Sequence, residues 1–148
     1  KGGNIMNQME VSFSAILDNE NFARTTVAAF LTPLNPTIDE IIEWKTIVSE
    51  AVSNAIIHGY NQNTECSVVM KMKIDGRQVQ LIVQDYGKGI ENLEEVKAPF
   101  YTTAKDLEHA GMGLTIIETL ADQLEIESVV NIGTKLIITK SLKNHDTI

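Results

Sequence analysis

With 148 residues, of which 43% are apolar and 22% charged, the chain has the length and composition of one globular domain rather than of a disordered segment. Its 12 Lys and Arg against 20 Asp and Glu give a net charge of −8, which argues against nucleic acid as a partner, because phosphate binding needs a basic surface. The single cysteine, Cys66, excludes an internal disulfide, and the lack of a long apolar run or a signal pattern leads us to expect a soluble cytoplasmic protein without a membrane partner.

Folded sequence is expected over residues 9–143. Residues 1–8 do not look like folded sequence and are interpreted as a disordered extension or a cloning remnant, and residues 144–148 as a tail. Because no internal repeat or Gly/Ser linker divides the rest, one domain is expected.

A strand and a helix open this domain. Apolar residues alternate with polar ones over residues 9–17, which is typical of a half-buried strand. A helix is expected over residues 19–31, with Asp18 or Asn19 as its N-cap, and Pro33 ends it. The buried face of this helix is predicted to carry Phe22, Ala23, Val27, Phe30 and Leu31.

The rest of the domain predicts two more helices and two β-hairpins. Thr37 and Glu40 have the spacing of a capping box, so a helix is expected from Thr37 to about Gly59. Two alternating runs joined by Asp75-Gly76 predict the first hairpin. The remaining elements are expected as a long loop at 86–112 with a short helix near 93–98, a helix at 114–122, and a second hairpin at 124–130 and 134–142. This order predicts an α/β two-layer sandwich in which helices cover one face of a mixed β-sheet.

Three polar residues line one edge of the second predicted helix. Glu50, Asn54 and His58 recur every four residues, and residues four apart lie on the same side of a helix. A solvated face is the simpler interpretation. Ile47 and Ile57 flank Glu50, however, which indicates that other parts of the chain cover this side.

Two glycine motifs follow, and each alone is ambiguous. Asp85-x-Gly87-x-Gly89 ends a predicted strand, where it is either a turn or a carboxylate presented to a flat ligand. Gly111 and Gly113 are expected at the start of the third helix, where free N–H groups and the helix dipole suit phosphate, although such pairs are common. The spacing matches neither a Walker A sequence nor a dinucleotide fingerprint.

Together and in this order, the three motifs resemble the Bergerat-fold ATPases, which include gyrase, heat-shock-90 chaperone, histidine kinase and mismatch-repair ATPase domains. The Glu50–Asn54 pair is similar to the N box of that family, the glycine motifs to its two glycine boxes, and residues 133–134 to its late Gly-Thr. A solitary domain of this size resembles the anti-sigma-factor serine kinases within the family. The runs at 48–60 and 100–103 are closest to the sporulation members.

The resemblance implies an ATP-dependent protein-serine kinase that uses Mg²⁺. It makes Glu50 the catalytic base, Asn54 the Mg²⁺ ligand, and Asp85 the acceptor for the adenine amino group, with support from Thr134. The ATP-binding residues that it implies are Asn54, Asp85, Gly87, Gly89, Thr102, Thr103, Gly111, Met112, Gly113, Leu114 and Thr134.

The resemblance also implies partners. A protein of this family holds an RNA polymerase sigma factor, phosphorylates an anti-anti-sigma protein on serine, and forms a homodimer. The first helix would bind the partners through Glu20 and Arg24, which from their spacing alone form an ordinary i,i+4 ion pair. Ala104 and His109 replace a lysine and an arginine of the family, which keeps open an alternative: a nucleotide-gated sigma-binding module with little kinase activity.

Overall fold

The computed structural model describes residues 6–59, 65–87 and 105–143, with only the backbone for the helical residues 58–59 and 105–112. The elements, in chain order, are β1 (Met6–Ser14), α1 (Asn19–Leu31), a 3₁₀ turn (Thr32–Leu34), α2 (Ile38–Asn54), a π-helical turn (Ala55–Gly59), β2 (Ser67–Asp75), β3 (Gln78–Asp85), α4 (Lys105–Leu120), β4 (Gln123–Val129) and β5 (Gly133–Ser141). The predicted order of strands and helices is therefore confirmed.

The five strands form one sheet in the order β1-β2-β3-β5-β4, and each neighbouring pair is antiparallel. The sequence predicts a mixed sheet, and here the structure differs. β4 runs in the same direction as β3, as expected when a helix connects two strands, but β5 lies between them. Among the described strands, no parallel neighbours can therefore form.

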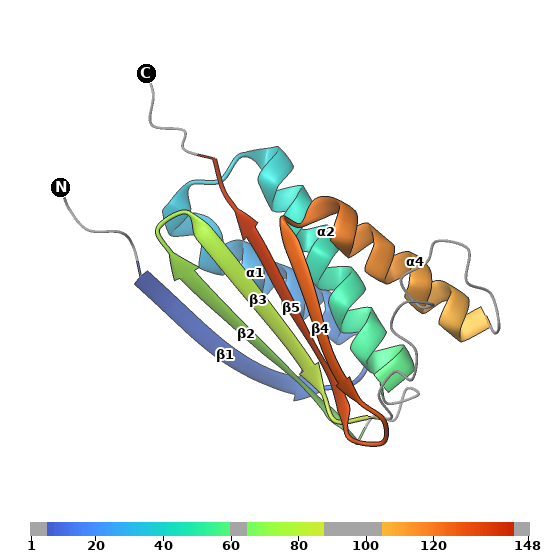
Figure 1. Cartoon of the computed structure of the whole chain (residues 1–148). Coiled ribbons are helices and arrows are strands. Elements are labelled where there is room, and N and C mark those ends of the chain that lie inside the picture. Colours follow the sequence, from blue (N-terminus) through green and yellow to red (C-terminus); the bar gives the residue numbers. More distant parts are fainter. Residues whose placement is uncertain (1–5, 60–64, 88–104, 144–148) are drawn as a thin grey trace.

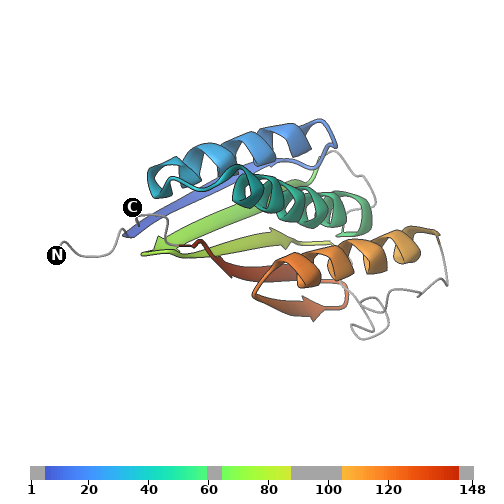
Figure 2. The same cartoon turned by 90° about the horizontal axis from the view of Figure 1, so that it is seen from above.

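In the described part of the chain, α1, α2 and α4 cover one face of the sheet, as Figure 1 and Figure 2 show from two directions. α2 lies in the middle of the helix layer and contacts both α1 and α4. The predicted α/β two-layer sandwich is thus confirmed. In the described part of the chain, no helix is long and apolar enough to cross a membrane.

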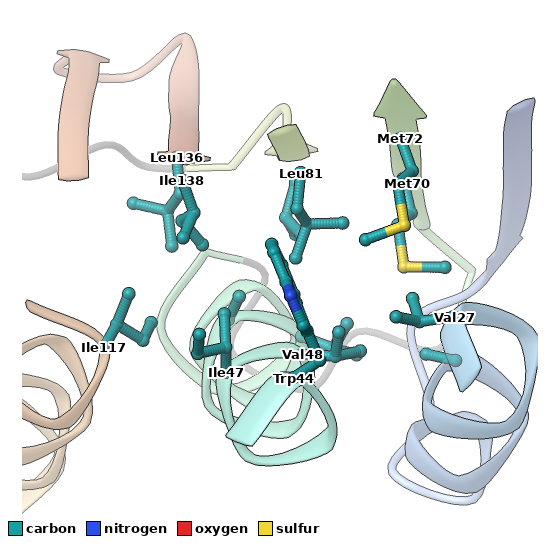
Figure 3. Packing of buried hydrophobic residues seen from close by; sticks show 14 of the residues in the cluster. Val27, Trp44, Ile47, Val48, Met70, Met72, Leu81, Ile117, Leu136 and Ile138 are labelled. Atoms are coloured by element: carbon teal, nitrogen blue, oxygen red, sulfur yellow. The ribbon is translucent and has the colours of Figure 1, made fainter. Parts of the chain in front are cut away.

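The hydrophobic core fills the space between the sheet and the helix layer. Trp44 of α2 is fully buried, and Figure 3 shows its indole extending from the helix toward Leu81 of β3. Met70 and Met72 of β2 and Ile117 of α4 are also fully buried and point into the same layer. Because each such side chain contributes about 1.5–3 kcal/mol, this layer stabilises the fold far more than surface ion pairs do.

The two predicted helix starts have different outcomes. The capping box of α2 is confirmed: the Glu40 N–H donates to Thr37 Oγ1 at 3.1 Å, and the Thr37 N–H donates to Glu40 Oε1 at 2.9 Å. Asp18 occupies the N-cap position of α1, one of the two positions predicted, but makes no side-chain cap hydrogen bond. The Asn19 side chain instead donates to the Ser14 carbonyl at 2.9 Å and joins α1 to the end of β1.

Three other local predictions are wrong. β1 begins at Met6, inside the segment predicted to be disordered, because residues from Met6 onward pair with β2. α4 begins at Lys105 instead of near Leu114. Phe22 of α1 is 47% exposed rather than on the buried face, and its ring packs edge-on against Phe13 with a centroid distance of 5.8 Å.

Candidate functional site

Glu50 and Asn54 lie one turn apart on α2, on an edge that other parts of the chain cover. Ile47 on this side is fully buried and Asn54 is 7% exposed, so the prediction of a covered edge is confirmed. The Asn54 Oδ1 atom is buried, and within residues 6–59, 65–87 and 105–143 it has no hydrogen-bond partner. A buried acceptor without a partner costs about 1–3 kcal/mol, which makes this oxygen a candidate for binding a ligand.

The Glu50 carboxylate lies against the backbone of α4. A Cβ atom added to Gly113 would come within 2.9 Å of Glu50 Oε1, closer than real Cβ atoms approach other atoms. A side chain at position 113 would therefore displace the carboxylate. Glycine at position 113 leaves room for the present position of the Glu50 carboxylate.

Asp85 ends β3 and is 3% exposed. Its carboxylate accepts hydrogen bonds from the backbone N–H of Gly87, at 2.9 Å, and from that of Thr134. Burial raises the pKa of Asp85 from 3.8 to about 6, and the two N–H groups lower it in part. At neutral pH this group is an ionised acceptor at the edge of the core.

The start of β5 is packed directly against Asp85. Gly133 has a φ of +150°, and a Cβ there would lie 2.2 Å from the Asp85 carbonyl oxygen. Only glycine allows this approach, which brings the buried Thr134 into register with Asp85. Thr134 Oγ1 lies 3.1 Å from Ser128 Oγ, a partner that the sequence analysis missed because alternation along β4 marks Ser128 only as a polar strand residue.

A hollow of about 210 Å³ lies at this end of the sheet. Its walls come from the ends of β3, β4 and β5, and include Asp85, Tyr86 and Thr134. Pockets for small molecules are commonly 300–1,000 Å³, so the hollow accommodates part of a ligand rather than a whole nucleotide. Residues 88–104, which follow β3 in the chain, are outside the described part.

The glycine pair lies inside α4 rather than at its start, which corrects the sequence analysis. Because α4 begins at Lys105, Gly111 and Gly113 are helical, and α-helical N–H groups at such interior positions are bonded to carbonyls four residues earlier. Glycine lowers helix stability by about 1 kcal/mol but does not end a helix. Leu114 is fully buried and belongs to the core.

Some predicted positions lie outside the described residues. These are Gly89, Thr102, Thr103, Ala104 and the short helix expected near 93–98. The side chains of His58, His109 and Met112 are likewise not described. Their predicted roles stay predictions.

A family model described as the histidine kinase-like ATPase domain matches residues 13–140. That segment contains both the Glu50–Asn54 edge and the Asp85–Thr134 pair. The chain belongs to this ATPase family. The family predicted from the three motifs is therefore confirmed.

Two curated relatives of this ATPase domain are each 51% identical to it and are named anti-sigma F factors. The one from Anoxybacillus flavithermus matches over 92% of this chain and 93% of its own length. The one from Priestia megaterium matches over 93% of this chain and 95% of its own length.

A solved structure has the same fold at low sequence identity. The crystal structure of the RsbU and RsbW domains of Rv1364c from Mycobacterium tuberculosis matches with a TM-score of 0.68 at 19% identity. The match covers 93% of this ATPase domain and 33% of that longer chain. At this identity the similarity shows the fold alone.

The predicted partner residues of this ATPase domain lie on α1, where they also contact α2. Arg24 and Glu20 form the expected i,i+4 ion pair, with an N–O distance of 3.2 Å. Both also contact Ser49, and Glu20 accepts a hydrogen bond from Ser53. Neither serine is predicted from the sequence, although their spacing of four residues beside the Glu50–Asn54 edge is a signal that could have found them.

Proposed function

We propose that this ATPase domain is an anti-sigma factor with protein-serine kinase activity. It holds the sporulation sigma factor sigma-F and phosphorylates the anti-anti-sigma antagonist on serine, with ATP as the phosphoryl donor. Membership of an ATPase family and 51% identity to proteins named anti-sigma F factors support this proposal.

The observation that carries the kinase activity is the pairing of Glu50 and Asn54 on one covered edge of α2. The buried Asn54 Oδ1 without a partner among the described residues fits an oxygen ligand of Mg²⁺, a hard cation that takes few protein ligands. When bound with ATP, Mg²⁺ neutralises charge on the phosphates. Asn54 would bind the ion, and Glu50, one turn away on the same helix, would act on the substrate serine.

Glu50 acts as the general base in this proposal. The substrate serine oxygen attacks the γ-phosphorus and gives its proton to the Glu50 carboxylate, while the bond to the β-phosphate oxygen breaks and ADP leaves. Gly113, which has no side chain, leaves room for the Glu50 carboxylate beside α4. The position of the base matters, because its distance to the serine oxygen determines the rate.

Asp85 and Thr134 are assigned to the adenine ring. The Asp85 carboxylate accepts a hydrogen bond from the adenine amino group, and it repels guanine, which has a carbonyl oxygen at that position. The hollow beside Asp85 and Thr134 supports this assignment. The other ATP-binding residues are assigned by resemblance: Gly87, Gly89, Thr102, Thr103, Gly111, Met112, Gly113 and Leu114.

The partner surface is assigned to α1, where Glu20 and Arg24 are 20% and 31% exposed at their side chains. A planar guanidinium that is partly exposed can pair with a carboxylate of the sigma factor or of the anti-anti-sigma protein. The proposal also includes a homodimer.

A phosphorylation assay tests the proposal. The chain is incubated with labelled ATP, Mg²⁺ and an anti-anti-sigma protein of the sporulation type, and the acceptor is analysed for phosphoserine. Phosphoserine that depends on this chain and on Mg²⁺ is the expected result. Nucleotide-dependent binding of sigma-F without phosphoserine would contradict the kinase activity and favour the binding module, for which His109 in place of an arginine is the supporting observation.

A further inference from the structure

A cluster of side-chain hydrogen bonds joins α1 to α2 beside the candidate site. Glu20 Oε1 accepts a hydrogen bond from Ser49 Oγ at 3.0 Å and one from Arg24 Nη1 at 3.2 Å. The second carboxylate oxygen, Oε2, accepts a hydrogen bond from Ser53 Oγ. Arg24 Nη1 also donates to Ser49 Oγ at 3.2 Å, which closes the cluster. One carboxylate thus binds three donors, two of them on α2.

The two serines lie one turn apart, and each directly precedes a residue of the candidate site. Ser49 precedes Glu50, and Ser53 precedes Asn54. Successive residues point about 100° apart around a helix, so the serine edge faces α1 while the adjacent edge, with Glu50, faces α4. The Glu20 carboxylate therefore holds the same two turns of α2 that carry Glu50 and Asn54.

Two attachments one turn apart constrain α2 in a way that one attachment cannot. They oppose rotation of the helix about its axis as well as sliding along it. Side-chain ends lie farther from the axis than the Cα atoms, which are about 2.3 Å from it, so a small rotation shifts a carboxylate considerably. A shift of about 1 Å at a reacting group can lower a rate about 10²-fold.

We propose that Glu20 is a positioning residue for phosphoryl transfer: through Ser49 and Ser53 it fixes the orientation of the α2 edge that carries Glu50 and Asn54. This inference rests on the kinase activity proposed above. It gives Glu20 a role besides partner binding, because the carboxylate oxygens are already bonded inside the chain. The competing explanation is that the hydrogen bonds only stabilise the packing of α1 on α2.

The test changes the serines and leaves Glu20 intact. In the Ser49→Ala/Ser53→Ala double variant, we expect kcat for serine phosphorylation to fall tenfold or more. The affinity for the acceptor protein should stay within about twofold of wild type, because neither serine is assigned to that ligand. KM for ATP should rise as kcat falls, because Ser53 holds the turn of α2 that carries Asn54. Ser53→Thr keeps the hydroxyl donor and should retain the wild-type kcat.

Thr46→Ala is the matched control. Thr46 lies on α2 before Ser49, and its hydroxyl donates to the Ile42 carbonyl at 2.9 Å rather than to Glu20. This variant should match wild type in kcat and in melting temperature. If the double variant does not fold, Ser53→Ala alone is judged by the same criteria.

Each outcome has one meaning. A fall in kcat with unchanged acceptor affinity and melting temperature, together with the wild-type kcat in Ser53→Thr, supports positioning. A serine-to-alanine variant with the wild-type kcat overturns it, as does a parallel loss of kcat, acceptor affinity and melting temperature, which is what a packing role alone predicts. A wild-type chain that transfers no phosphate overturns the proposed kinase function itself, and the positioning role with it.

Discussion

The two polar edges of α2 differ in how their hydrogen bonds are satisfied. On the edge toward α1, Ser49 and Ser53 both donate to the Glu20 carboxylate. On the other edge, Asn54 Oδ1 is buried without a partner among the described residues, although it is only one residue from Ser53. Adjacent residues of one helix thus have opposite hydrogen-bonding states.

This difference distinguishes polar groups that are hydrogen-bonded within the chain from a polar group that is available to a ligand. Buried polar atoms in folded proteins are nearly always hydrogen-bonded, so an exception needs a reason. The α1 edge is complete within the chain and acts on the candidate site by holding α2. The edge with Asn54 is incomplete, and in the proposed function a cation bound by the Asn54 oxygen completes it. Changes on the two edges should therefore alter different measurements.

The largest effect is expected for Glu50→Gln. This change keeps the shape of the side chain and removes the proton acceptor, so phosphoryl transfer should fall about 10²- to 10⁴-fold, the range for a lost general base. ATP and sigma-F affinity should stay nearly unchanged. Glu43→Gln is the control, because Glu43 on the same helix pairs with Lys140 at 3.3 Å and has no role at the site. A Glu50→Gln chain that works at the wild-type rate would remove Glu50 from the mechanism.

Asn54→Ala examines the incomplete edge directly. The variant should lose about 10- to 100-fold in ATP affinity when Mg²⁺ is present, and little when the metal is chelated. Its melting temperature without ligand should not fall, because the change removes a buried oxygen that has no hydrogen bond within the described residues and costs about 1–3 kcal/mol. Calorimetric titrations with and without Mg²⁺ measure both affinities, and an unchanged dependence on Mg²⁺ would show that Asn54 does not hold the ion.

The sequence predicts the parts of this structure that depend on local patterns. Alternation and turn residues locate the strands, and the capping box at Thr37 marks where α2 begins, because each of these signals involves residues close in the chain. The covered side of α2 is also predictable, since Ile47 flanks Glu50. The family motifs add the site residues that no periodicity can single out.

The sequence does not predict the parts that depend on distant packing. The Glu20 contacts join residues 29 and 33 positions apart, and nothing local specifies them. The missing parallel pair follows from the insertion of β5 between β3 and β4, which is a property of the whole sheet. The start of α4 at Lys105 was missed because Gly111 and Gly113 favour a helix start there, whereas α4 tolerates both.

Asp85→Asn should weaken ATP binding by about 1–3 kcal/mol, the range for losing a hydrogen bond to a charged group in a closed site. Asp85 lines the hollow at the end of the sheet, and its carboxylate binds two backbone N–H groups. Calorimetry measures the change in ATP affinity. Unchanged ATP affinity would show that the adenine ring does not bind at Asp85.

The raised pKa of Asp85 predicts that the stability of the protein depends on pH. Burial raises the pKa of Asp85 to about 6, above its ordinary value of 3.8, so the folded state binds the proton more tightly than the unfolded state does. The ionised carboxylate therefore lowers the free energy of unfolding above pH 6, and this cost disappears as the pH falls toward 4. The advantage of Asp85→Asn over wild type in thermal melts should shrink over the same window. A constant difference between pH 4 and 7 would contradict the buried, ionised state.

The smallest effect is expected for Arg24→Ala, which removes the contacts of Arg24 with Glu20 and Ser49. Arg24 contributes an ion pair to Glu20 that is worth only a few tenths of a kcal/mol in a helix, and Ser49 and Ser53 still hold Glu20 without it. Folding and ATP affinity should therefore stay close to wild type. The exposed part of the guanidinium is assigned to a partner carboxylate, so sigma-F affinity should fall by about 1–2 kcal/mol, within the range of interface residues that matter. Lys45→Ala, which removes an exposed cation from α2, controls for the change in net charge. Titrations with sigma-F measure the affinity, and thermal melts check the fold. Equal sigma-F affinity in the Arg24→Ala and Lys45→Ala variants would show that Arg24 makes contacts only inside the chain and that the partner surface lies elsewhere on the molecule.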